Sequence, residues 1–165
     1  MDRKGVIMGD TQARPTDISG INHTGLHVRD VERSIAFYRD LIGLELLTRR
    51  QSRADYVADI VGYPGAIINM AWLRHPSGGP IIELLEYVEP AGQPVDTATA
   101  NPGTAHVCFS VPDIQATYRH LKAAGVRFKS DGPVAITAGA NQGGYAIYFT
   151  DPDGITLELI QPRPE

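Results

Sequence analysis

The stretch HTGLHVRDVERS, residues 23–34, decides the fold of this chain because it returns as HVCFSVPDIQAT at residues 106–117. The two stretches align without a gap, so that His23 meets His106 and Asp30 meets Asp113. Each begins with the alternating side chains of a strand and continues with apolar residues at the three- and four-residue spacing of a helix. A sequence that repeats itself in this way predicts two copies of one structural unit.

The residues that follow each stretch predict the same order of elements, a strand, a helix and then three strands. In the first copy, LELLTRR (44–50) is typical of a strand, and IINMAWLRH (67–75) and IIELLEY (81–87) predict a hairpin. In the second copy, VRFKSDGPV (126–134) is extended, and GGYAIYFTDPDGITLELIQ (143–161) predicts a hairpin. The Asp-Pro-Asp-Gly of this last segment is a strong turn signal.

The repeat also divides the chain of 165 residues, which is long enough for one domain with a real core. Residues 1–19 are expected to form a polar, poorly ordered tail. Residues 20–165 are expected to form a single domain, with one module at 20–88 and the other at 104–162. The segment between them, 89–103, is rich in Pro, Gly, Ala and Thr and is expected to be a linker.

The composition excludes several classes of protein. A net charge of -4 implies no general attraction to nucleic acid or to an anionic membrane. No apolar run approaches the roughly 20 residues of a membrane helix, and the N-terminus has no apolar region typical of a signal peptide. Cys108 is the single cysteine, which excludes an internal disulfide. Together these features predict a cytoplasmic protein, and none of them identifies a chemistry.

Each module carries one histidine in its first strand and one glutamate in its last, which are His23 and Glu83, then His106 and Glu158. Side chains alternate between the two faces of a strand, and all four lie opposite the apolar residues of their strands. An unpaired carboxylate is costly to bury, and a bound cation would compensate. Two imidazoles and two carboxylates suit an octahedral divalent metal with two positions left for water or substrate. Two solvated strand faces are the alternative, but the matched quartet favours the metal.

Four further residues are candidates to line a cavity beside these ligands. His27 lies on the same strand face as the first candidate histidine, and Cys108 lies on the same face as the second. Asn141 and Tyr145 belong to the Gly-rich stretch AGANQGGY (138–145), which closes over a ligand or forms a plain surface loop. A satisfied or exposed histidine and a small core cysteine are the alternatives for the first two.

Four segments together resemble the vicinal oxygen chelate superfamily, which holds glyoxalase I, methylmalonyl-CoA epimerase, extradiol dioxygenases, fosfomycin-resistance enzymes and bleomycin-resistance proteins. They are INHTGLHVRDVERSIAFYRDLIGLELL, IIELLEY, GTAHVCFSVPDI and IYFTDPDGITLELIQ, and the resemblance covers roughly residues 20–162. It implies an α+β fold of two tandem βαβββ modules, which form a curled mixed sheet, an incomplete barrel, around a metal site. It also implies the metal ligands His23, Glu83, His106 and Glu158.

The complete ligand set resembles glyoxalase I and the epimerases more than the extradiol dioxygenases, which use two histidines and one glutamate. It implies a metal-dependent isomerase, epimerase or lyase that acts on a small oxygenated acid or thioester. Such an enzyme moves a proton next to a carbonyl through a metal-bound enediolate. The implied cofactor is a divalent ion, namely Zn, Ni, Co, Mn or Fe. Glu158 is the first candidate for the base and Glu83 the second, whereas clear glutathione-binding features are not recognised.

Two other functions stay open at this point. One is an Fe(II) extradiol-type dioxygenase, and the other is a non-catalytic small-molecule binding protein of the bleomycin-resistance type. The expected partners are a small-molecule substrate and, because dimers are common in the resembling family, a second copy of the chain. Modules from one chain or from two chains can pair around the metal in that family. The sequence therefore leaves open whether the site lies within one chain or across a homodimer.

Overall fold

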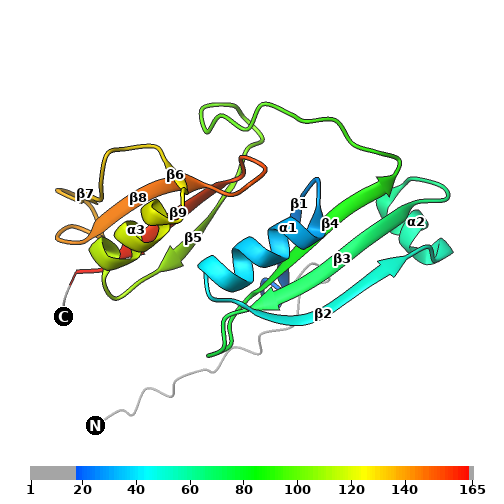
Figure 1. The fold of residues 1–165 in the computed structure, drawn as a ribbon, viewed down its shortest axis with the longest axis horizontal. Helices are drawn as coiled ribbons and strands as arrows, with labels where there is room; N and C mark the ends of the chain where they lie inside the picture. The colour runs from blue at the N-terminus through cyan, green and yellow to red at the C-terminus, as the bar shows by residue number, and fades with distance from the viewer. Residues whose placement is uncertain (1–17, 164–165) are drawn as a thin grey trace, which may run out of the picture.

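The computed structural model describes residues 18–163, so the predicted tail lies outside the described residues except for its last two positions. A four-stranded and a five-stranded sheet lie side by side, and one helix packs over each (Figure 1). The predicted α+β class with mixed sheets is confirmed, and the two sheets do not close into a barrel, in agreement with the expected incomplete barrel. Within the described residues, none of the helices combines the length and apolar character that crossing a membrane requires.

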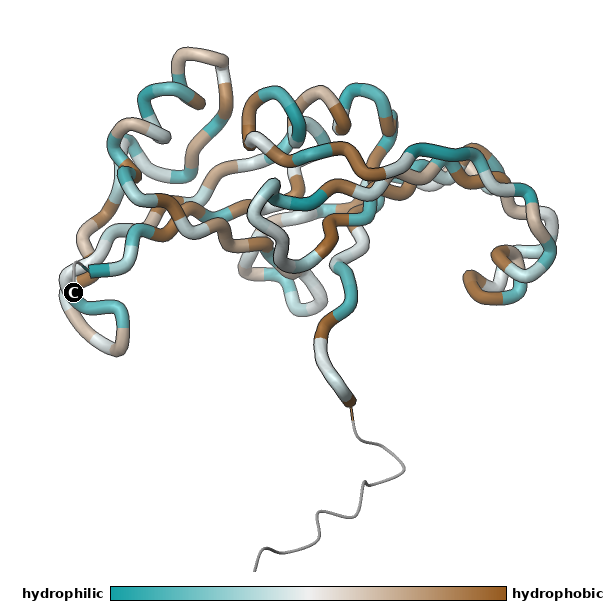
Figure 2. The backbone as a smooth tube through the Cα atoms, turned by 90° about the horizontal axis from the view of Figure 1, so that it is seen from below, coloured by the Kyte–Doolittle hydropathy of each residue, from teal (hydrophilic) through white to brown (hydrophobic). Residues whose placement is uncertain are grey.

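The first module contains the predicted elements and one further helix. Its elements are β1 (His23–His27), α1 (Val31–Ala36), a π-helical turn η1 (Phe37–Leu41), β2 (Glu45–Ser52), α2 (Asp55–Val61), β3 (Ile67–Arg74) and β4 (Ile81–Glu89). The strand order is β1-β4-β3-β2, and β1 runs parallel to β4 while the other pairs are antiparallel. The helix α1 crosses over one side of the sheet, between β1 and β2. The helix α2 lies on the opposite side (Figure 2).

The second module repeats this arrangement with shorter middle strands. Its elements are β5 (His106–Ser110), α3 (Ile114–Ala123), β6 (Arg127–Phe128), β7 (Val134–Ala135), β8 (Tyr145–Thr150) and β9 (Thr156–Gln161). The strand order is β5-β9-β8-β6, and β7 also pairs with β8. The predicted extended segment 126–134 thus forms two short strands. Pro133, which has no N–H for a strand ladder, follows a glycine between them.

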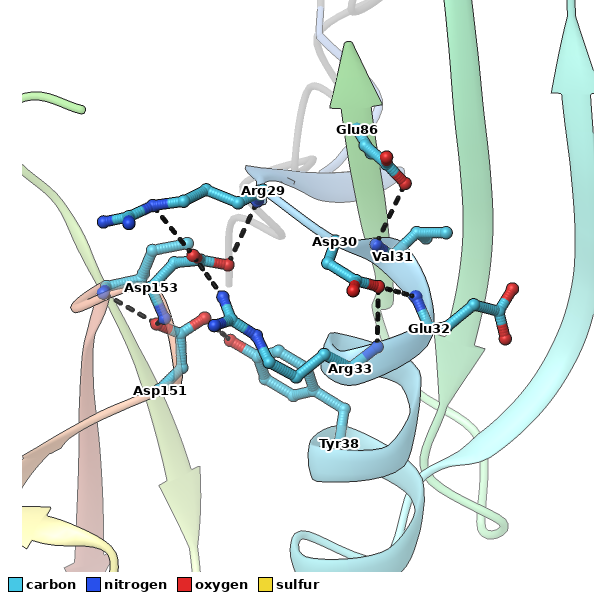
Figure 3. Close-up of polar contacts among 10 residues, drawn as sticks. Arg29, Asp30, Val31, Glu32, Arg33, Tyr38, Glu86, Asp151 and Asp153 are labelled. Carbon is cyan, nitrogen blue, oxygen red and sulfur yellow. Dashed lines mark hydrogen bonds and ion pairs between the residues drawn. The ribbon is translucent and has the colours of Figure 1, made fainter. Parts of the chain in front are cut away.

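The two helices begin with matching side-chain contacts. Asp30 and Asp113 cap α1 and α3 by accepting hydrogen bonds from N–H groups of the first turn. The carboxylate of Glu86 on β4 accepts a hydrogen bond from the first N–H of α1 at 3.1 Å (Figure 3). The amide oxygen of Gln161 on β9 does the same for α3 at 2.9 Å. Each last strand is therefore tied to the start of its own helix.

One continuous apolar core lies between the two helices and the two sheets. The first module contributes, among others, Ile35 and Leu84, and the second contributes Ile114, Phe149 and Leu157. Burial of such side chains stabilises a fold by about 1.5–3 kcal/mol each. Because side chains alternate along a strand, the neighbours of these core residues point to the opposite faces of the sheets. Those opposite faces, away from α1 and α3, are called the open faces below.

A buried polar contact also joins the modules at η1, the turn that follows α1. The hydroxyl of Tyr38, which is fully buried, donates a hydrogen bond to Asp151 in the β8–β9 turn at 3.2 Å. Asp153 of the same turn forms ion pairs with Arg29 and Arg33 (Figure 3). Burial raises the pKa of Asp151, although the hydrogen bonds that its carboxyl accepts act in the opposite direction. The first helix of one module is thereby fixed to a turn of the other.

We expect Tyr38→Phe to lower the free energy of unfolding by about 1–3 kcal/mol, because the buried Asp151 carboxyl loses its hydroxyl donor. Urea unfolding followed by circular dichroism measures the difference. Tyr56→Phe is the matched control, because Tyr56 lies on α2 and is 55% exposed. Equal stability of the two variants would show that the contact contributes nothing to the joint between the modules.

Candidate metal centre

The first candidate pair joins neighbouring strands on the open face of the first sheet. Nε2 of His23 on β1 lies 3.2 Å from Oε2 of Glu83 on β4. Trp72 lies directly opposite Glu83 on β3, and its indole N–H donates a hydrogen bond to Oε1 at 2.8 Å. The Glu83 side chain is 10% exposed, whereas that of His23 is 41% exposed. The carboxylate is therefore buried and held by Trp72, and the imidazole is open to an incoming ligand.

The second pair has the same construction on the open face of the second sheet. Nε2 of His106 on β5 lies 3.0 Å from Oε2 of Glu158 on β9, and the side chains are 41% and 16% exposed. Tyr148 lies opposite Glu158 on β8, with its hydroxyl 3.5 Å from Nε2 of His106. Cys108 lies opposite Glu158 on the other side, on β5. A tyrosine and a cysteine thus stand beside this carboxylate, where the first pair has a tryptophan and Gly25.

The neighbours of Glu158 are held in their protonated forms. Partial burial, followed by the charge of Glu158, raises the pKa of the Cys108 thiol to about 12. The same two causes raise the pKa of Tyr148 above its ordinary value. Thiolate is the nucleophilic form of cysteine, so this shift disfavours Cys108 as a nucleophile. Both side chains instead carry protons beside a carboxylate.

The donor atoms of each pair suit one side of a divalent metal site. Imidazole nitrogen and carboxylate oxygen bind such ions at about 2.1 Å, so two ligands at right angles lie roughly 3 Å apart. The distances of 3.2 Å and 3.0 Å match that spacing. However, among residues 18–163 no three His, Cys, Asp or Glu side chains gather closely enough to hold a metal. One chain therefore keeps the four expected ligands as two separate pairs and does not wrap them around a single centre.

Two of the candidate cavity-lining residues, His27 and Asn141, lie in different surroundings. His27 lies at the end of β1, where its ring stacks on Tyr87 with centroids 5.5 Å apart, and it lines a pocket of about 860 Å³. Asn141 is exposed in the turn between β7 and β8. His27 thus lines a cavity on the open face of its sheet, whereas Asn141 lies at the surface.

Two aromatic residues beside the pairs, Trp72 and Tyr148, were not named from the sequence. Tyr145 has the same strand parity as the core residue Ile147, but it is the first residue of β8 and is 38% exposed. Tyr148 faces Glu158 by the same rule. Trp72 faces the open side because Ala71 and Leu73 are in the core. The strand periodicity that selected the glutamates contains the signal for both aromatic residues.

The chain matches known proteins over most of its length. The family model described as the Glyoxalase/Bleomycin resistance protein/Dioxygenase superfamily matches residues 20–159. A probable lactoylglutathione lyase of Vibrio parahaemolyticus is 34% identical over 146 residues, which cover 87% of this chain and 91% of that protein. A 2-epi-5-epi-valiolone epimerase of Actinomyces sp is 30% identical over 146 residues, which cover 85% and 78%. The crystal structure of a glyoxalase family protein from Bacillus cereus shares the fold, with a TM-score of 0.80 at 20% identity, and the match covers 92% of this chain and 100% of that one.

Proposed function

Because this chain belongs to the glyoxalase/bleomycin resistance protein/dioxygenase superfamily, we propose that it is a metal-dependent isomerase, epimerase or lyase. In this proposal it moves a proton on the carbon next to a carbonyl group of a small oxygenated acid or thioester. The observation that carries the proposal is the pair of imidazole and carboxylate on each sheet, alike in spacing and in exposure. The names of the related lyase and epimerase support the same class of reaction.

The complete centre in this proposal forms between two copies of the chain. One copy contributes His23 and Glu83, and the other contributes the partner subunit's His106 and Glu158. Two observations support this arrangement. The four side chains form two separate pairs within one chain, and a shared core fixes the modules side by side. A homodimer related by a two-fold axis would carry two equal sites, because each copy offers both halves.

The surroundings of the two pairs differ, and this difference favours Glu83 as a fixed metal ligand and Glu158 as the base. A divalent ion bound here would act as a Lewis acid on the carbonyl oxygen of the substrate. Trp72 holds one carboxylate oxygen of Glu83, which suits a fixed ligand. Glu158 has no indole donor, and the thiol of Cys108 beside it is only a weak hydrogen-bond donor. In this proposal Glu158 is therefore the less firmly held carboxylate, which takes the proton from the substrate carbon and returns it.

The metal content of the purified protein tests the proposal. We expect about one divalent ion per chain for the wild type and loss of most of it in His106→Ala, because one of four ligands is removed. His120→Ala is the matched control, since His120 is exposed on α3, and it should keep the wild-type content. Full metal content and unchanged affinity in His106→Ala would reject the assignment. Oxygen consumption during turnover would instead identify the dioxygenase alternative.

A further inference from the structure

A pocket on the open face of the first sheet adjoins the candidate ligands of that sheet. It has a volume of about 860 Å³, within the range of roughly 300–1,000 Å³ that is usual for small-molecule sites. Its walls are the ends of β1 and β4, residues 90–95 of the linker and the β8–β9 turn. Leu85 and Tyr87, which line it, follow Glu83 on the same face of β4, at about 7 Å and 13 Å along the strand.

Gly25, which has no side chain, leaves space above β1 between the candidate ligands and this pocket. It lies opposite Glu83 and between His23 and His27 on the same face of β1. A Cβ atom there would lie 3.5 Å from the side chain of Leu85, so any larger group would project into the space above the sheet. A glycine inside a strand marks a bulge or the close approach of another group, and the β1–β4 register has no bulge.

The pocket offers apolar and aromatic surface, and its charged groups are already paired. Leu85, Tyr63 and Tyr87 contribute to the lining, and the two tyrosine rings meet edge to face with centroids 6.0 Å apart. Arg29 and Asp153, which also line the pocket, form an ion pair with each other at 3.4 Å. The Arg29 side chain is 65% exposed, so an ion pair between it and a charged ligand group would add little affinity, whereas burial of an apolar group in the pocket is favourable.

We propose that the substrate carries an uncharged aromatic or alkyl group, which passes over Gly25 and fills this pocket. The identity of its other end, a carbonyl flanked by oxygen, rests on the function proposed above. The distance from Glu83 to Leu85 and Tyr87 requires a short chain between the carbonyl and the apolar group. A substrate with a charged, peptide-like tail in this position does not suit the lining.

Three hydroxyketones that differ only at one end test the proposal. They are 1-hydroxy-4-phenylbutan-2-one, 1-hydroxybutan-2-one, which lacks the ring, and 5-hydroxy-4-oxopentanoate, which has a carboxylate in place of the ring. Isothermal titration calorimetry of the metal-loaded protein measures the three affinities. We expect the phenyl compound to bind at least about tenfold more tightly than either of the others. Equal affinities, or tighter binding of the carboxylate, would overturn the proposal.

Gly25→Val tests whether the phenyl group reaches the pocket by passing over Gly25. The larger side chain should weaken binding of the phenyl compound about tenfold or more relative to binding of 1-hydroxybutan-2-one, with metal content measured on the same samples. Thr24→Val is the matched control, because Thr24 lies on the other face of the same strand, and it should bind both compounds like the wild type. An unchanged phenyl preference in Gly25→Val would show that the group binds elsewhere.

Protein stripped of metal separates this inference from the proposed function. The phenyl compound should still bind more tightly than the carboxylate compound, because the pocket contains no candidate metal ligand. If the protein binds no metal but keeps this preference, the proposed function fails and the pocket assignment stands. If it binds metal and shows no preference, the pocket assignment fails alone.

Discussion

Glu158→Gln should slow the exchange of a substrate α-proton with solvent by about 10²–10⁴-fold, which is the usual effect of removing a positioned base. The amide is close in shape to the carboxylate but does not accept a proton at neutral pH. Glu83→Gln should have a smaller effect on exchange and should mainly weaken metal binding, because Trp72 holds Glu83 in the role of a ligand. The two variants remove the same charge from equivalent positions of the repeat, so each is the matched comparison for the other.

The measurement is incorporation of deuterium from solvent into 1-hydroxy-4-phenylbutan-2-one or a better substrate, with metal content determined on the same samples. If Glu158→Gln exchanges as fast as the wild type with metal bound, Glu158 is not the base. If both variants keep their metal and the wild-type rate, the metal-centred proton transfer is wrong and a binding protein becomes the better account. Glu45→Gln, an exposed change on β2, controls for the loss of one charge.

Two inactive variants should restore each other if the site is shared between subunits. His23→Ala and His106→Ala damage opposite halves, so a mixed dimer contains one doubly damaged site and one intact site. Random exchange of subunits makes half of the dimers mixed, and about a quarter of the wild-type metal and exchange rate should return. Neither variant should show appreciable activity alone, so recovery on mixing is a large effect.

Mixing His23→Ala with Glu83→Ala is the control for this experiment. Both changes lie in the same half of the site, so every site in the mixed dimer keeps one damaged half. No recovery is expected there. Recovery in neither mixture, with subunit exchange verified by mass, would show that each site belongs to a single chain.

The order of strands and helices within each module could be predicted from the sequence because the two copies of the repeat show the same pattern independently. The aligned copies predicted the order of strands and helices, and the caps Asp30 and Asp113 mark the helix starts in the structure. Strand periodicity placed Glu83 and Glu158 opposite the core, and each lies within 3.2 Å of the histidine of its own module. These features depend on residues close in sequence or on neighbouring strands.

The relative position of the two modules was not accessible in the same way. It depends on a shared core and on the contact between Tyr38 and Asp151, which lie 113 positions apart and match no local pattern. The sequence therefore left open whether one chain encloses the metal, and the structure keeps the two pairs apart. The pocket beside Gly25 depends in turn on the linker and on the β8–β9 turn, whose positions follow from the same packing.

The shared core and the contact between α1 and the β8–β9 turn also bear on how the repeat arose and what it has become. Two copies that descend from one ancestral unit would at first have been identical in sequence. Here Ile35 of one copy and Phe149 of the other belong to the same apolar interior. A smaller cluster around Ile68, beside α2, belongs to the first copy alone, but the larger interior contains side chains of both copies. A mutation that disrupts the shared interior in one copy therefore destabilises both copies, and natural selection acts on the duplicated chain as a whole.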